Sequence, residues 1–115
     1  MLATILAACL ALGACASSND AAKMLDPDPP EKMYAEADAL LSRGKFEAAA
    51  KKFEDLDRDH PYSPEARRAM VMAAYAYWRA GKPDEAIATA RRYTTMHPGT
   101  KEAALAHHII ISAYF

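Results

Sequence analysis

Apolar residues recur along most of this chain with the spacing of amphipathic helices. From Glu31, apolar side chains repeat at intervals of three and four residues until Gly44, a residue type that commonly ends helices. A second segment of the same character begins at Phe46 and runs to Pro61. Because only a short turn separates the two segments, they predict one antiparallel pair of helices.

The same pattern predicts three further helices after Pro61. Ser63 can cap the first of them with its hydroxyl, Pro64 suits the first helical position, and the helix continues to Gly81. Thr100 is a second candidate cap, for a last helix that is still running at the end of the chain. Between these two helices the pattern predicts a partner helix that opens at Pro83 and ends at His97-Pro98-Gly99.

The predicted helices repeat at a fixed distance along the chain. His60-Pro61 recurs as His97-Pro98, 37 residues later, and Tyr77 recurs at the same offset as Tyr114. A period in this range is typical of stacked helix pairs. The sequence therefore predicts an all-α fold of antiparallel helix pairs stacked into a short superhelical array. Its units are 31–61, 64–98 and an incomplete 100–115, which together form one domain, 31–115.

The spacing within each unit resembles the tetratricopeptide repeat. That repeat places a glycine, an aromatic ring, an alanine, a second ring and a proline at set intervals, which the first unit provides as Gly44, Phe46, Ala49, Phe53 and Pro61. The second unit departs from the pattern, because Pro83 and Ala90 stand where the two rings are expected. Packing in the second unit must therefore be supplied differently.

Composition and charge narrow the possible functions. The chain carries 14 basic and 15 acidic side chains, a net charge of −1, which argues against the clustered basic surface that nucleic-acid binding needs. Both cysteines, Cys9 and Cys15, precede the predicted helices, so the helical domain has neither a disulfide nor a cysteine nucleophile. The adjacent His107 and His108 point about 100° apart on a helix and make a poor metal chelate. The sequence predicts no enzyme, no cofactor and no metal site.

The first thirty residues differ in character from the rest. Residues 1–14 are an apolar, small-residue run that resembles a signal peptide, although the first basic residue of the chain is Lys23. Residues 12–15, Leu-Gly-Ala-Cys, resemble the lipobox of bacterial lipoproteins, which implies that Cys15 is acylated. Residues 15–30 continue as a polar, acidic, proline-bearing stretch, which predicts a flexible linker. The alternative is that residues 1–14 form the apolar first helix of a soluble protein.

The stretch EAAAKKFEDLDRDHPYSPEARRAMVMAAYAYWRAGKPDEAI, residues 47–87, resembles the BamD family of lipoproteins from the β-barrel assembly machine. The resemblance extends from Cys15 over the rest of the chain and departs at Pro83 and at His107-His108, where family members usually carry tyrosines. It implies an outer-membrane scaffold on the periplasmic face that takes part in assembly and insertion of β-barrel proteins. The implied partners are a BamA-type insertase, other Bam lipoproteins and unfolded outer membrane proteins.

Members of that family resemble a five-repeat rod, so this chain is expected to be an N-terminal portion. A stack of repeats needs a polar terminal helix, yet the last predicted helix ends on apolar side chains. We therefore expect these side chains to lack a covering partner: Ile109, Ile110, Ile111, Tyr114 and Phe115.

The repeat pattern also implies a groove, because the first helix of each pair lines the concave surface of such arrays. Aromatic rings with interspersed arginines suit an extended peptide that ends in a carboxylate. The family resemblance implies that this peptide is the C-terminal segment of unfolded outer membrane proteins, which ends in an aromatic residue. Tyr77 recurs as Tyr114 and is assigned to the core instead. The candidate groove residues are Tyr34, Asp38, Leu41, Arg68, Val71, Tyr75, Trp78, Arg79, Leu105, His108 and Ser112.

Several alternatives remain open at the level of sequence. Tyr75 and Trp78 fit a helix core as well as a groove, and Arg68 and Arg79 fit a solvated face. The same features also suit another periplasmic repeat lipoprotein, one that serves cell-envelope or secretin assembly. A third possibility is the helical half of a two-domain envelope enzyme whose catalytic residues lie elsewhere.

Overall fold

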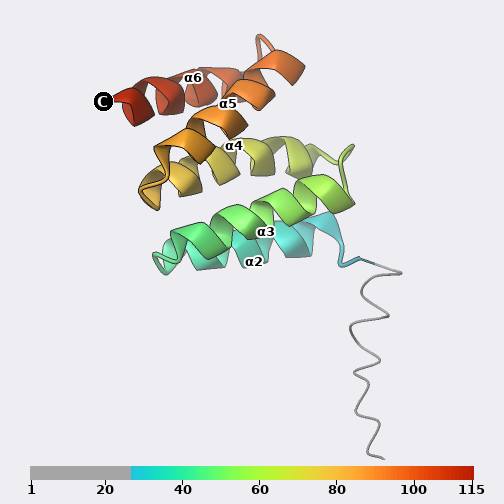
Figure 1. Cartoon of the computed structure of the whole chain (residues 1–115). Helices are drawn as coiled ribbons and strands as arrows, with labels where there is room; N and C mark the ends of the chain where they lie inside the picture. The colour runs from blue at the N-terminus through green and yellow to red at the C-terminus, as the bar shows by residue number, and fades with distance from the viewer. Residues whose placement is uncertain (1–26) are drawn as a thin grey trace, which may run out of the picture.

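The computed structural model describes residues 27–115, which form five α-helices and no strand. Successive helices reverse direction and stack in chain order (Figure 1). The all-α, tetratricopeptide-like fold predicted from the sequence is confirmed. The predicted signal peptide, Cys15 and most of the predicted linker lie outside the described residues. The helices are α2 (Pro30–Ser42), α3 (Phe46–Asp59), α4 (Pro64–Arg79), α5 (Pro83–Met96) and α6 (Lys101–Tyr114).

Local signals in the sequence set the helix ends. The hydroxyls of Ser63 and Thr100 accept hydrogen bonds from the backbone N–H groups three residues later, at 3.0 and 3.2 Å, so both predicted caps are confirmed. Gly44 ends the turn after α2 with a φ of 75°, a conformation that suits residues without a Cβ. The N–H of Lys45 reaches back to the carbonyl of Leu40 at 3.0 Å, which completes a Schellman motif.

The start of α2 differs by one residue from the predicted boundary. The sequence places Pro30 in the linker, whereas the structure makes it the first residue of the helix. Proline is well tolerated there because its fixed φ suits a helix and its missing N–H would have no intrahelical partner. His60, in the cap position after α3, holds this entry segment through its Nε2, which lies 2.7 Å from the backbone oxygen of Asp28.

Helix α4 is the centre of the fold, because it packs against each of the other described helices. Small residues such as Ala69 and Ala73 line it and let its neighbours approach closely, while Phe53 from α3 and Tyr93 from α5 fill the remaining space. Tyr77 is also buried, as predicted. The first helices of the pairs, α2, α4 and α6, contact one another in sequence, whereas the backbones of α3 and α5 do not pack together.

The second unit fills its core differently from the first. Ala90 is fully buried where the first unit has Phe53, and Tyr93 supplies the missing volume three residues later. The Tyr93 hydroxyl lies 2.9 Å from Oγ1 of Thr100, so its polar end is satisfied by the residue that also caps α6. One side chain therefore links the core of α5 to the start of the next helix.

The sequence predicts that five apolar residues at the end of α6 lack a covering partner, and this prediction is correct for only some of them. Ile109 is 1% exposed and Ile110 packs against the core, because α6 buries one face against α4 and α5. The opposite face carries Ile111, Tyr114 and Phe115, which are exposed. Residues three and four apart share a helix face, so Ile109 and Ile111 necessarily point to different sides.

Two ion pairs connect α3, the second helix of the first repeat, with α5 and the residue before it, in the second repeat. Nζ of Lys82 lies 3.0 Å from Oε1 of Glu47, and Nη2 of Arg92 lies 2.8 Å from Oδ2 of Asp57. The hydrogen bond from Lys82 is the largest of the influences that lower the pKa of the Glu47 carboxyl. Because the backbones of α3 and α5 do not pack together, these side chains bridge a gap.

Candidate functional site

Some of the predicted groove residues form two separate clusters on the face made by α2 and α4. In the first cluster the Arg68 guanidinium carbon lies 4.7 Å from the centre of the Tyr34 ring, a cation–π arrangement. Tyr34 in turn meets the buried Phe53 edge to face, with ring centres 5.3 Å apart. The half-buried ring therefore holds an exposed arginine at a fixed place on the surface.

The second cluster is built around Arg79, at the end of α4. Its guanidinium carbon lies 4.7 Å from the Phe46 ring centre and 5.8 Å from that of Tyr75, and its Nη1 donates to the Tyr75 hydroxyl at 2.7 Å. The Tyr75 and Trp78 rings lie 5.9 Å apart. A pocket of about 340 Å³ opens beside the cluster. Its lining comes from α2, the following turn, α3 and α4: Leu41, Ser42, Gly44, Phe46, Tyr75 and Arg79.

Neither arginine forms an ion pair with another residue in the range 27–115. Their positive charges are oriented by aromatic rings and not neutralised by carboxylates. A guanidinium in this state can form paired hydrogen bonds with an incoming carboxylate while the rings contact an apolar side chain. The arrangement around Arg79 and Tyr75 thus has the chemistry required to hold the end of a peptide chain.

Val71 does not belong to this surface, and the prediction that it does is wrong. It is 1% exposed and lies in the core, because α4 is enclosed by four neighbouring helices and has little free surface. His108 is exposed on α6 but makes no hydrogen bond, ion pair or ring contact with a described residue. Asp38 and Leu105 are also exposed, while Leu41 and Ser112 are half-buried.

Sequence reasoning missed Phe46 as a surface residue. The repeat pattern assigns it to packing between helices, yet its half-buried ring lies under the Arg79 guanidinium. The two residues meet because the turn after α2 comes close to the end of α4. An aromatic residue two positions after a turn glycine, together with an arginine at the end of the first helix of the next pair, is the signal that could have identified it.

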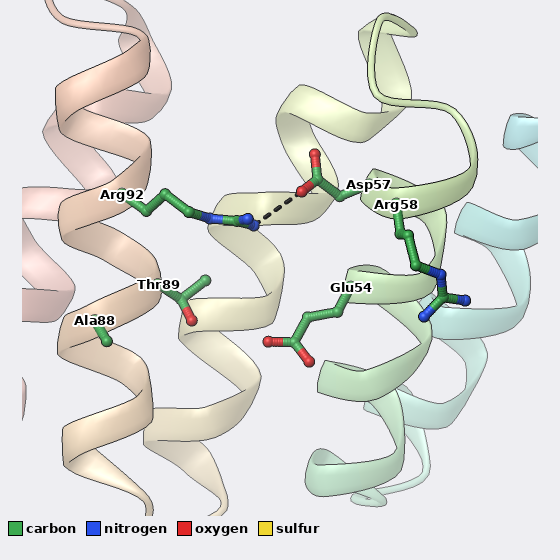
Figure 2. A pocket seen from close by; sticks show the side chains of 6 residues that line it. All are labelled: Glu54, Asp57, Arg58, Ala88, Thr89 and Arg92. Carbon is green, nitrogen blue, oxygen red and sulfur yellow. Dashed lines mark hydrogen bonds and ion pairs between the residues drawn. The ribbon is translucent and has the colours of Figure 1, made fainter.

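A second recess lies between α3 and α5, where the Arg92–Asp57 ion pair crosses (Figure 2). We call it the outer groove; its volume is about 480 Å³. Tyr77, from α4 beneath, donates its hydroxyl to Oε2 of Glu54 at 2.9 Å. Burial raises the pKa of this phenol, and the Glu54 carboxylate raises it further, to about 12. The lining residues are Glu54, Asp57, Arg58, Ala88, Thr89 and Arg92.

Within residues 27–115, no three histidine, cysteine, aspartate or glutamate side chains are grouped as a metal site requires. None of the helices in the same range has the length and apolar character needed to cross a membrane.

Comparison with known proteins assigns the chain to one family. Residues 26–115 match the YfiO family, which is described as outer membrane lipoprotein. The chain belongs to this family. The match covers all of the described helices and thus both candidate surfaces. Together with the relatives described next, it confirms the resemblance to the BamD family that was expected from residues 47–87.

Curated relatives of this YfiO family member carry the name outer membrane protein assembly factor BamD. The protein from Caulobacter vibrioides is 29% identical over 114 residues, which are 99% of this chain and 37% of that protein. The protein from Neisseria gonorrhoeae is 36% identical over 92 residues, 77% of this chain and 34% of that protein. A protein from Xylella fastidiosa is 31% identical over 116 residues, which cover 100% of this chain and 37% of that protein. The chain spans less than half the length of these relatives.

Proposed function

We propose that this protein is a scaffold of the β-barrel assembly machinery and takes part in assembly and insertion of β-barrel proteins into the outer membrane. The observation that carries the proposal is the family match over residues 26–115, together with relatives named outer membrane protein assembly factors. Because the chain spans only part of those relatives, the proposed role is that of their N-terminal helical array. It acts by binding and not by catalysis.

The concave face formed by α2 and α4 is proposed to bind unfolded outer membrane proteins. Arg79 would take the terminal carboxylate of such a chain, and Tyr75 and Trp78 would contact its final aromatic side chain. The orientation of Arg79 between two rings supports this role, because a pre-positioned guanidinium loses less entropy on binding. Arg68 on Tyr34 offers a second contact further along the same helix. The remaining proposed partners are a BamA-type insertase and other Bam lipoproteins.

The protein is further proposed to be anchored through a lipid on Cys15 at the periplasmic face of the outer membrane. Changing Cys15 to Ala should abolish labelling by radioactive palmitate in growing cells, because the acylated thiol is removed. Cys9→Ala is the matched control, since Cys9 also follows an apolar run but is expected to keep full labelling. Equal labelling of the Cys15→Ala protein and the unchanged protein would contradict the anchor.

Arg79→Gln should weaken binding of a peptide that ends in phenylalanine with a free carboxylate by about tenfold, the usual effect of losing a charged hydrogen bond. The peptide is labelled at its N-terminus and followed by fluorescence anisotropy. The same peptide with an amidated end should bind the unchanged protein about as weakly as the free acid binds the variant.

Arg91→Gln is the matched control, because Arg91 is an exposed arginine on α5 and lies outside both concave clusters. It should bind the free-acid peptide with the affinity of the unchanged protein. If Arg79→Gln and Arg91→Gln have the same effect, or if amidation makes no difference, Arg79 does not receive the carboxylate.

A further inference from the structure

The outer groove is a candidate site that is independent of the concave face. It lies between α3 and α5, whose backbones do not pack together, and the Arg92–Asp57 ion pair crosses it (Figure 2). The concave clusters are built from α2, α4 and the start of α3 instead. A ligand in the outer groove would therefore contact a different surface of the same repeats.

The charges in the outer groove leave one carboxylate without a cation. Asp57 is paired with Arg92, and Arg58 is paired with Asp55 at 2.8 Å and with Asp59 at 3.2 Å. Figure 2 shows the Arg58 guanidinium directed away from α5, whereas the Glu54 carboxylate extends toward it. Glu54 forms no ion pair with any residue that the structure describes. It therefore gives the groove a local negative charge.

The bond from Tyr77 fixes the direction of this carboxylate. The phenol donates to Oε2 of Glu54 from the buried side, so the other carboxylate oxygen is left for a donor that comes from the groove. The phenol stays protonated at all physiological pH values, since its pKa is about 12. Glu54 is thus held in place as an acceptor before any ligand arrives.

Thr89 offers a second polar group on the opposite wall of the groove. It is 8% exposed, and within residues 27–115 its hydroxyl has no hydrogen-bond partner. Figure 2 shows that its oxygen points into the space between α5 and Glu54. No buried side-chain nitrogen or oxygen atom among residues 27–115 lacks a partner, so the unpaired Thr89 oxygen reaches solvent and is open to a donor that enters the groove beside Glu54.

We propose that the outer groove receives an arginine side chain from a partner protein. A guanidinium is planar, carries five N–H donors and is more weakly hydrated than an ammonium group, so it can donate to Glu54 and Thr89 together. A volume of about 480 Å³ accommodates such a side chain with part of its backbone.

The probe for this site is N-acetyl-arginine methylamide, which presents the side chain on a capped backbone unit. It is titrated into the ¹⁵N-labelled 115-residue chain and followed by two-dimensional NMR. We expect saturable shifts of the Ala88 and Thr89 amides with a dissociation constant in the millimolar range. The corresponding citrulline compound has the same shape without the charge and should bind at least about tenfold more weakly.

Two variants test whether the named residues form the site. Glu54→Gln keeps an acceptor for the Tyr77 hydroxyl but removes the charge, and Thr89→Val keeps the shape but removes the hydroxyl. Glu54→Gln should weaken arginine binding by about tenfold, and Thr89→Val should weaken it by a few-fold. Thr95→Val is the matched control, because the Thr95 hydroxyl bonds the Arg91 carbonyl on α5 outside the groove.

Thermal unfolding of each variant shows whether a loss of binding comes from a loss of fold. The proposal is overturned if the arginine compound gives no saturable shifts at Ala88 and Thr89. It is also overturned if citrulline binds equally well, or if folded Glu54→Gln protein binds arginine with unchanged affinity. These outcomes leave the proposed role of the concave face untouched, because Arg79→Gln tests that face separately.

Discussion

Phe53→Ala is expected to lower the free energy of unfolding by about 3–5 kcal/mol, the range found for removing large aromatic side chains from cores. Phe53 is 0% exposed and lies in the core formed by α2, α3 and α4. The alanines that surround it cannot move inward enough to fill the cavity, because they already hold the helices close together. The expected loss is a large share of the total stability of a small domain.

The loss is measured by urea denaturation followed by circular dichroism at 222 nm. Phe46→Ala is the matched control: it removes the same ring from a half-buried position under Arg79 and should cost less than half as much. Since Tyr34 rests edge-on against Phe53, the core variant should also release the Arg68–Tyr34 contact. Similar losses for the two variants would show that Phe53 is not the packing centre of the first unit.

The helix boundaries could be predicted because they depend on residues close together in the sequence. Ser63 and Thr100 cap α4 and α6 through bonds to the N–H groups of the next turn. Gly44 and Gly81 both take a positive φ at the same place in consecutive repeats. Such signals need no knowledge of the rest of the fold, and a fixed 37-residue offset then predicts how the pairs stack.

The distribution of surface and core could not be predicted as well, because it depends on how many neighbours each helix has. The repeat pattern treats the first helix of every pair alike and places Val71 on a free face. Helix α4, however, has neighbours on both sides and buries Val71, while α6 leaves Tyr114 exposed at the position of the buried Tyr77. Identical repeat positions thus differ in burial according to their place in the stack.

The outer groove escaped prediction for a related reason. It exists because the backbones of α3 and α5 stay apart, and no local pattern reveals the distance between two helices. A partial signal was present, since Glu47 and Lys82 and then Asp57 and Arg92 are opposite charges at the same separation of 35 residues. Two such matches in succession predict ion pairs between equivalent helices, and hence a space for them to cross.

Tyr77 is expected to make the stability of the protein fall between pH 10 and pH 12. Its pKa is about 12 in the folded protein, against 10.0 for an ordinary tyrosine, because burial and the Glu54 carboxylate disfavour the phenolate. Below pH 10 the phenol is neutral in both the folded and the unfolded chain, so ionisation of Tyr77 does not lower the stability of the fold. As the pH rises toward 12, the phenol of the unfolded chain ionises first, which lowers the free energy of unfolding by up to about 3 kcal/mol.

Urea denaturation of the unchanged protein and of Tyr77→Phe at a series of pH values isolates this contribution. The variant lacks the ionisable group, so its stability should fall less steeply than that of the unchanged protein over this interval. Tyr114→Phe is the matched control, because Tyr114 is exposed and its removal should leave the steep fall in place. If the unchanged protein and Tyr77→Phe give parallel curves, the Tyr77 phenol is not held against the Glu54 carboxylate. The floor of the outer groove would then lack the fixed acceptor on which arginine binding depends.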